Sequence, residues 1–277
     1  MGKFFILNAD DFGMTKEHNK AVLEGYNNGF LTSVSLLANG EAFSAAVNDI
    51  LPECPNIGVG VHLNISTGKS LTKCDLLTNQ NGYFNGGFIY FWLKSEDKKF
   101  LKQLEQEFRA QIEKIKAHSN IDHISSKGNI HIIPGICKLI SKLAKEYDIR
   151  FIRTLEEKIY FVPEIFKHIN FHFPFNFIKI LFLNNISKLN TTELIDARYK
   201  HYVLGLEYAN LLTPETIELG LKSIDEENCI VECIIKPCFS DTVKNAHTTE
   251  FAITQDRRLE DTINRLGFEI TNYKNIK

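Results

Sequence analysis

The 277-residue sequence lacks any long run of basic residues, and its formal net charge is −2. Proteins that hold nucleic acid through its phosphates carry basic patches, so the sequence gives no support for nucleic-acid binding. It also lacks an apolar run of the ~18 residues that a membrane span needs. The first apolar segment begins almost at the N-terminus, which leaves no room for a signal peptide. We therefore expect a protein with neither nucleic acid nor a membrane as partner.

Paired cysteines are missing as well. The six cysteines are scattered and none forms a CxxC pair, which argues against a cysteine-based zinc site. We interpret them as reduced thiols of a cytoplasmic protein. Hydrophobic residues make up 44% of the chain and charged residues 24%, as in an ordinary globular protein with a sizeable core. Internal repeats and clear linkers are absent, so we expect a single domain over residues 1–277.

What the sequence does contain is an alternation of short apolar runs, which predict strands, with helical patterns. The expected strands are 4–7, 31–38, 57–63, 121–125, 149–152, 230–235 and 268–270. The expected helices are 15–29, 41–51, 97–118, 134–147, 213–222 and 257–266. This alternation favours a parallel, right-handed βαβ array. About seven strands are enough for an α/β fold of the incomplete or distorted (β/α)-barrel kind.

One Phe-rich segment, near residues 158–190, breaks this order. Seven phenylalanines crowd together there among Lys, Asn, His and Pro, which is too polar a mixture for a membrane helix. We expect an insertion into the domain at this point. It could add to the core or make an oligomer contact. It could also form a lid over a binding site, because exposed aromatic side chains mark binding surfaces.

Polar side chains gather where four of the expected strands end. The four clusters are Asp10 with Asp11, His62 with Asn64, His123 through Lys127 to His131, and Lys236 through Asp241. In a parallel α/β array the C-terminal strand ends meet on one face, where ligands bind. Each cluster alone has a plainer interpretation: a turn for the aspartates, a structural histidine, or a solvated surface lysine. Four clusters in register are a stronger signal than any one of them.

The adjacent Asp10 and Asp11 are the most informative pair. Two neighbouring carboxylates repel each other unless a cation, a proton or hydrogen-bond donors hold them. One of them could bind a metal ion while the other acts as a base.

With these clusters in view, the sequence resembles the YdjC-like carbohydrate deacetylases, metal-dependent hydrolases that remove N-acetyl groups from acetylated sugars such as chitooligosaccharides. The resemblance covers nearly the whole chain and rests on several motifs together. They are NADDFG at 8–13, GVGVHLN at 58–64, TGKSL at 67–71, LLT at 76–78, NGYF at 81–84, Gln111, Glu232, Pro237, Asp241 and RRLE at 257–260. The resemblance implies a distorted, incomplete (β/α) barrel of the glycoside hydrolase/deacetylase type and an acetylated sugar as substrate. The family is often dimeric, and the Phe-rich segment is the first candidate surface for a homodimer.

The resemblance also implies roles for individual residues. In the family, the second Asp of the pair and two histidines bind a divalent cation, Mg or Zn, and Asp11 and His62 match the first two of these ligands. Asp10 matches the general base that acts on the attacking water. A metal polarises the amide carbonyl and lowers the pKa of bound water, and a neighbouring carboxylate can then take the proton. Asn64 is a candidate for contact with the substrate.

The chain departs from the family pattern in its third and fourth clusters. The family motif His-x-Asp-Ser-His-x-His-x-His-x-x-Pro here has Ser125 for its Asp, Lys127 for the second metal-binding His, and Asn129 for a further His. Lys236 replaces the histidine before Pro237, a position that the resemblance implies is catalytic through proton transfer. A charged lysine has no lone pair to offer a metal. Losing a ligand and gaining a positive charge should weaken metal affinity strongly.

Three explanations of Lys127 remain open. It could replace the metal as the cation beside the aspartates, or the protein could have kept a sugar-binding cleft and lost hydrolysis. In the third explanation, His123 or His131 moves in as a substitute ligand, which would require a turn in the chain. We therefore expect a carbohydrate deacetylase, with a non-catalytic sugar-binding or regulatory homologue as the alternative.

Two structural expectations follow from these clusters. The side chains of all four clusters should surround one cleft at the C-terminal ends of the strands. Lys127 should form an ion pair with Asp11 or Asp10, because its ammonium offsets part of their charge.

Overall fold

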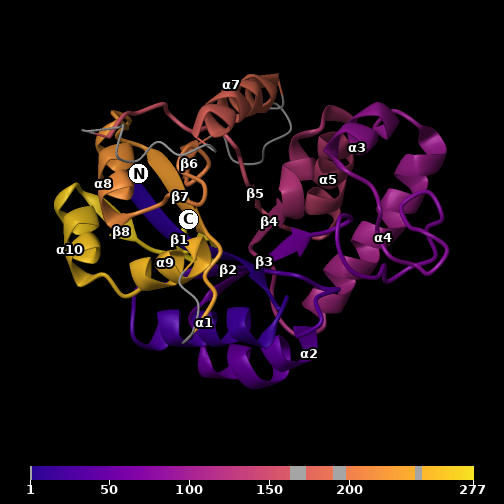
Figure 1. Cartoon of the computed structure of the whole chain (residues 1–277), viewed down its shortest axis with the longest axis horizontal. Helices are drawn as coiled ribbons and strands as arrows, with labels where there is room; N and C mark the ends of the chain where they lie inside the picture. The colour runs from indigo at the N-terminus through magenta and orange to yellow at the C-terminus, as the bar shows by residue number, and fades with distance from the viewer. Residues whose placement is uncertain (1, 163–172, 190–197, 241–244) are drawn as a thin grey trace.

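The computed structural model describes residues 2–162, 173–189, 198–240 and 245–277, and within them an eight-stranded sheet is wrapped by helices (Figure 1). The strands are β1 (Lys3–Phe12), β2 (Ser33–Leu36), β3 (Gly58–Leu63), β4 (His123–Ser126), β5 (Phe151–Ile152), β6 (Lys200–Leu204), β7 (Cys229–Ile235) and β8 (Phe268–Ile270). Their order is β5-β4-β3-β2-β1-β7-β6, and β8 pairs with the start of β1. Every pairing between these strands is parallel, as the alternation predicted.

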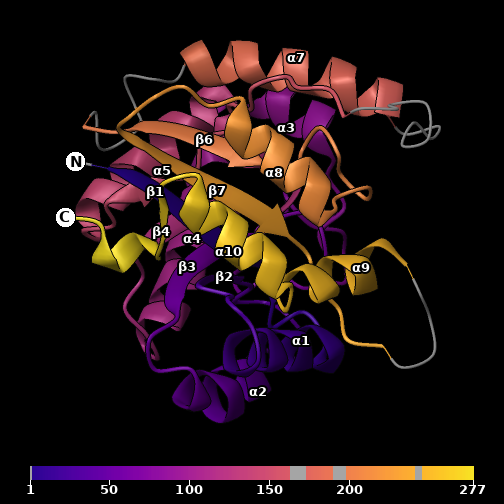
Figure 2. The same ribbon diagram turned by 90° about the vertical axis from the view of Figure 1, so that its left-hand side faces the viewer.

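Helices cover the outer side of this sheet, as two perpendicular views show (Figure 1, Figure 2). They are α1 (Lys16–Asn27), α2 (Phe43–Ala45), α3 (Phe88–Lys94), α4 (Lys98–Lys116), α5 (Pro134–Glu146), α7 (Phe173–Leu189), α8 (Pro214–Lys222), α9 (Ala246–Ile253) and α10 (Arg257–Arg265). A short π-helical turn and a 3₁₀ turn continue α2 as far as Glu53. Capping side chains set several starts, such as Thr15 before α1 and Asp97 before α4. Among the described residues, no helix is both long and apolar enough to cross a membrane.

The sequence did not predict four of the elements and predicted a fifth too short. Strand β6 and helices α3 and α9 were not expected, because each is short, and helix α7 was not expected because the Phe-rich segment around it was interpreted only as an insertion. Strand β1 was expected to stop at Leu7, but it continues to Phe12 and includes both aspartates. Of the expected Phe-rich insertion, residues 163–172 and residue 190 lie outside the described part of the chain.

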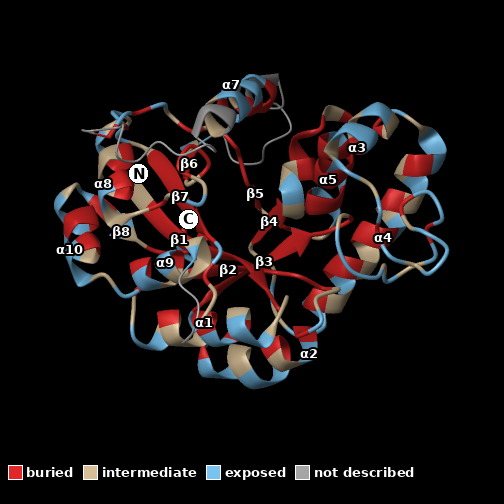
Figure 3. Ribbon diagram, in the orientation of Figure 1, coloured by how far each residue is buried: buried red, intermediate tan, exposed pale blue. Residues whose placement is uncertain are grey.

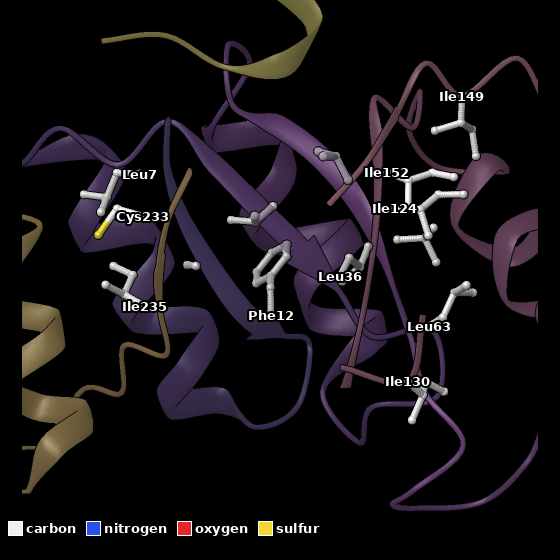
Figure 4. Packing of buried hydrophobic residues seen from close by; sticks show 14 of the residues in the cluster. Leu7, Phe12, Leu36, Leu63, Ile124, Ile130, Ile149, Ile152, Cys233 and Ile235 are labelled. Carbon is white, nitrogen blue, oxygen red and sulfur yellow. The ribbon is translucent and has the colours of Figure 1, made fainter. Parts of the chain in front are cut away.

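The two faces of the strands differ sharply in chemistry, because successive side chains along a strand point to opposite faces. On the outer face, residues such as Leu7, Leu63 and Ile235 pack against the helices and form the main core (Figure 4). On the inner face, β1 presents Asn8 and Asp10, and other strands present Ser, His, Glu and Gly. Figure 3 shows that the strands are mostly buried, and the less buried strand residues lie at the starts of β1 and β6 and in β8. The polar inner residues are therefore enclosed and need partners of their own.

The sheet is an open half-barrel, which agrees with the distorted, incomplete barrel predicted from sequence. Within the described residues, no strand pairing joins β5 to β6. The segment after β5 bridges them, because Val203 N–H donates to Glu156 O at 2.9 Å. Helix α7 lies over this gap, where Ile180 and Leu183 join a small apolar cluster with residues of β6 and β7. The interior therefore stays enclosed without a closed ring of strands.

The pattern IGVGVHL has glycines because the neighbouring strand leaves no room for a side chain. Gly60 pairs with His123 across β3 and β4, and a Cβ on Gly60 would overlap the His123 imidazole. That ring cannot move away freely, since it stacks on Tyr273 with ring centroids 4.6 Å apart.

We predict that Gly60→Ala lowers the free energy of unfolding by about 1–3 kcal/mol, the usual effect of overpacking a core. The matched control is Gly87→Ala, because an added Cβ there meets no atom within 4 Å. It should change stability by no more than about 0.5 kcal/mol. Urea denaturation of both variants measures the difference, and equal stabilities would contradict this account of β3.

Candidate functional site

A cavity of about 250 Å³ lies at the C-terminal ends of the strands. Each of the four sequence clusters contributes to its lining. The contributing residues are Asp10 after the middle of β1, His62 in β3, Ser126 with Gly128 after β4, and Lys236 directly after β7. Three amide side chains, Asn129, Asn176 and Asn210, complete a mostly polar wall. The fold therefore brings residues distant in sequence to one polar pocket.

A break in the regularity of β1 places both aspartates on the same side. In a regular strand, Asp10 and Asp11 would point to opposite faces. The register with β2 shifts between Ala9 and Phe12, and the φ angle of Asp11 is 62°. Such a bulge redirects a side chain, and Asp tolerates this left-handed conformation better than most residues. As a result, Asp10 Oδ1 and Asp11 Oδ1 lie 3.9 Å and 3.6 Å from the two ring nitrogens of His62.

Asp10 is held by a buried arginine. The Arg153 guanidinium donates to both Asp10 oxygens, at 2.9 Å to Oδ2 and 2.7 Å to Oδ1. Its remaining donors reach Glu232, at 2.6 Å for the closest pair. Glu232 also accepts a hydrogen bond from the Tyr273 hydroxyl at 2.8 Å. Arg153 therefore ties the end of β5 to β1 and β7 across the interior of the half-barrel.

These contacts keep Asp10 ionised. Burial alone would raise the pKa of its carboxyl, but the charge and hydrogen bonds of Arg153 hold that pKa well below its usual range. The same bonds occupy most of the carboxylate lone pairs, so they weaken Asp10 as a proton acceptor while they fix its position.

His62 is neutral and oriented. Burial lowers the pKa of His62 to about 4. Its Nδ1 lies 2.7 Å from Ser125 Oγ, and the Ser125 hydroxyl donates onward to Ser35 Oγ at 2.9 Å. The contact with Ser125 fixes the orientation of the ring, and Nε2 faces Asp11 Oδ1 at 3.6 Å.

Lys127 forms the ion pair that the sequence led us to expect. Its Nζ lies 2.8 Å from Asp11 Oδ1, and the lysine side chain is 17% exposed. Burial raises the pKa of Asp11, but the charge and hydrogen bond of Lys127 help to hold that pKa below its ordinary value. Lys127 itself does not line the cavity; Ser126 and Gly128 on either side of it do.

The other predicted residues lie elsewhere. His123 has both ring nitrogens engaged, with Asp122 Oδ1 at 2.6 Å and Ser35 Oγ at 3.2 Å. His131 is buried with Nδ1 2.6 Å from Ser126 Oγ. Asn64 bonds to Asn39 and to residues 66 and 67, so its side chain holds the loop after β3. Asp241 lies outside the described residues.

Sequence reasoning missed Arg153 and did not assign a role to Glu232. Arg153 directly follows β5. A search for polar residues at the C-terminal ends of the predicted strands, which identified the four clusters, would therefore also have identified Arg153. Glu232 lies inside the apolar VECII run of β7, where a lone carboxylate signals a buried partner.

Known proteins resemble this chain over most of its length. A family model described as "YdjC-like protein" matches residues 4–265. A carbohydrate deacetylase from Clostridium beijerinckii is 27% identical and covers 98% of this chain and 96% of its own length. A chitooligosaccharide deacetylase from Salmonella typhimurium is 30% identical over 53% of this chain and 57% of its own.

The fold also matches a solved structure. A protein from Enterococcus faecalis, described as a "putative cellobiose-phosphate cleavage protein", superimposes with a TM-score of 0.76 and 22% identity. The match covers 99% of this chain and 98% of that one.

We predict that Arg153→Met lowers the free energy of unfolding by about 3–5 kcal/mol, because it leaves two buried carboxylates without their partner. Arg109→Met is the matched control, since Arg109 also pairs with two glutamates, Glu105 and Glu146, but at the surface. Its loss should cost no more than about 1 kcal/mol. Urea denaturation would refute the buried network if both variants lost the same stability.

We also predict that acid destabilises the fold through His131. Burial lowers the pKa of His131 to about 3, below the unfolded value of about 6.5. Between those values only the unfolded state binds this proton, so stability falls as the pH drops below about 6.5, by up to about 1.4 kcal/mol per pH unit. Unfolding measured at pH 4, 5 and 6 should show a shallower slope for His131→Gln. The exposed His118 provides the control, His118→Gln, which should keep the wild-type slope.

Proposed function

The chain belongs to the YdjC-like family, and on that premise we propose that it hydrolyses N-acetyl groups of an acetylated saccharide bound in the cavity beside Asp10. The main support is the convergence of Asp10, His62 and Lys236 on one polar cavity. The names of its relatives, carbohydrate deacetylase and chitooligosaccharide deacetylase, support the same class of substrate.

The cavity suits a sugar. Its amide side chains, Asn129, Asn176 and Asn210, can both donate to and accept from hydroxyl groups. At about 250 Å³ it is slightly smaller than the ~300–1,000 Å³ pockets that enclose drug-sized ligands. We infer that it encloses one acetylated sugar residue, and that any further residues of an oligosaccharide lie outside it.

The reaction splits the amide bond between the sugar nitrogen and the acetyl carbon. A water oxygen bonds to the acetyl carbon, the carbon–nitrogen bond breaks, and the nitrogen gains a proton. We place Asp10 next to the water, because its Oδ2 accepts one hydrogen bond, from Arg153, and keeps a second lone pair that can take the proton even though the charge pairing makes it a weak base. Lys236 follows β7, which pairs with β1 on the side opposite to β2 and β3. We propose that its ammonium donates the proton that the leaving nitrogen gains.

The family's divalent cation fits these residues only in part. Asp11 Oδ1 and His62 Nε2 lie 3.6 Å apart, a separation that one ion bonded at about 2.0–2.2 Å to each could span. A catalytic zinc site usually has three protein ligands, and the third position here is Lys127. Among the described residues, no group of three or more His, Cys, Asp or Glu side chains could hold a metal ion. We therefore route no step of the reaction through a metal.

The homodimer that the resemblance implies remains part of this proposal. Apolar side chains are exposed on two neighbouring helices, with Ile89 and Leu93 of α3 and Ile178 of α7 each at least 65% exposed. Ring contacts of Phe88 and Trp92 with Phe182 join the two helices. Such a patch supports the Phe-rich segment as the contact surface.

The test is acetate release from N-acetylglucosamine oligomers. We expect Asp10→Asn to lower kcat/KM by a factor on the order of 10²–10⁴, the usual contribution of a general base. The exposed Lys138 on α5 supplies the control, Lys138→Met, which should keep full activity. Thermal melts of both variants separate lost chemistry from lost folding.

Two outcomes would contradict the proposal. Unchanged turnover in a folded Asp10→Asn variant would remove Asp10 from the reaction. Binding of the oligomers without acetate release, by calorimetry on the wild type, would favour the non-catalytic sugar-binding alternative.

A further inference from the structure

The ion pair between Lys127 and Asp11 occupies the place where the family's cation would be bound. Lys127 Nζ lies 2.8 Å from Asp11 Oδ1, the same oxygen that lies 3.6 Å from His62 Nε2. An ion shared by Asp11 and His62 would therefore have to sit close to an ammonium group. The two cations would compete for one carboxylate oxygen and repel each other.

The backbone fixes Lys127 in this position. It is the first residue after β4, and the next two residues, Gly128 and Asn129, both adopt positive φ angles of 70° and 59°. The Ser126 hydroxyl accepts the His131 backbone N–H at 3.0 Å and closes the turn. The ammonium also lies 3.9 Å from Met14 Sδ. Lys127 is thus held by a tight turn and by contacts with the β1 end, unlike a freely moving surface lysine.

The charges around the aspartates are already nearly balanced. Three carboxylates and two cations are in direct contact there: Asp10, Asp11 and Glu232 with Arg153 and Lys127. Their formal sum, −3 + 2, is −1, and the other charged residues that line the cavity, Lys179, Lys236 and Glu250, add +1 and bring it to zero. A divalent cation added to this set would leave an excess of positive charge beside the buried Asp10, Asp11, Glu232 and Arg153.

No other described side chain completes a metal site. Both nitrogens of His123 are engaged by Asp122 and Ser35, so the ring would have to break a hydrogen bond to bind an ion. His131 is not among the residues that line the cavity; its Nδ1 lies on Ser126, and its buried Nε2 has no hydrogen-bond partner, but it joins no group of three ligand side chains among the described residues. Asp10 has both oxygens on Arg153. The substitution of Lys127 is therefore not compensated by any described neighbour.

We propose that the Lys127 ammonium replaces the divalent cation of the family, so that this protein holds its aspartate pair without a bound metal. The positive charge that Asp11 takes from a cation elsewhere in the family comes here from the chain itself. The inference deepens the proposed function, because it concerns the same site, but it makes a prediction about metal binding that does not depend on any acetate being released.

The test is zinc binding by isothermal titration calorimetry on the full chain, purified without chelator. We compare the wild type with Lys127→His, which supplies a third ligand beside Asp11 and His62, and with Lys127→Met, which removes only the charge. Lys138→His, on the exposed face of α5, measures what an added surface histidine contributes. We expect Lys127→His to bind one zinc at least about 100-fold more tightly than the wild type and Lys138→His.

Thermal unfolding gives a second measurement. The Tm of the wild type should be the same with and without EDTA, whereas the Tm of Lys127→His should rise with zinc and fall with EDTA. If Lys127→His does not fold, Lys127→Met still decides the question, because loss of the charge should by itself raise zinc affinity above that of the wild type.

The inference is overturned if the purified wild type carries close to one zinc, nickel or magnesium per chain, or binds zinc as tightly as Lys127→His. Activity is read separately. Acetate release that EDTA leaves unchanged in the wild type supports both proposals. Weak zinc binding with no acetate release refutes the proposed function alone, and acetate release that requires zinc refutes this inference alone.

Discussion

The buried guanidinium of Arg153 is the interaction on which the rest of the site depends. In the strand order, β5 is at one end of the open sheet, and β1 and β7 are near the other. Arg153 follows β5 and reaches the carboxylates of both distant strands, Asp10 and Glu232. A half-barrel has no closed ring of strand pairing to fix its curvature. The contact of Arg153 with Asp10 and Glu232 therefore helps to fix the distance between β5 and the strands β1 and β7. Removing one charge from such a set leaves the others buried without partners.

A second constraint acts at the end of β1. The bulge at Ala9–Phe12 turns Asp11 toward the same region as Asp10, and without it adjacent aspartates could not share a histidine. Few residues other than glycine adopt the left-handed conformation of Asp11, and aspartate is one of them. Asp11 is therefore suited both to the bulge and to its place beside His62. Asn8 adds a hydrogen bond of 3.0 Å to Asp10 Oδ1. Backbone geometry and charge pairing therefore support each other at this strand end.

The sequence was sufficient to predict the parallel α/β architecture, because alternating apolar runs and helical patterns are local signals. It also predicted that Asp10, His62 and Lys236 would be close together, because strand ends converge in such a fold. It could not reveal the bulge, since nothing in Asp10–Asp11 distinguishes a bulge from a turn. Nor could it pair Arg153 with Asp10, 143 positions away, because that contact exists only once β5 faces β1.

The gap between β5 and β6 has a consequence for how the protein can evolve. Exposed strand edges are templates for unwanted pairing with other chains, and here β5 has only two residues and α7 covers the opening. Helix α7 is attached by side chains, such as Asn184 bonding to Glu157 O at 2.8 Å, and not by a strand ladder. Its sequence can therefore drift without disturbing the sheet. Asn176 of α7 lines the cavity. Substitutions in this helix can therefore change which ligand the cavity prefers, while the charged residues at the strand ends stay unchanged.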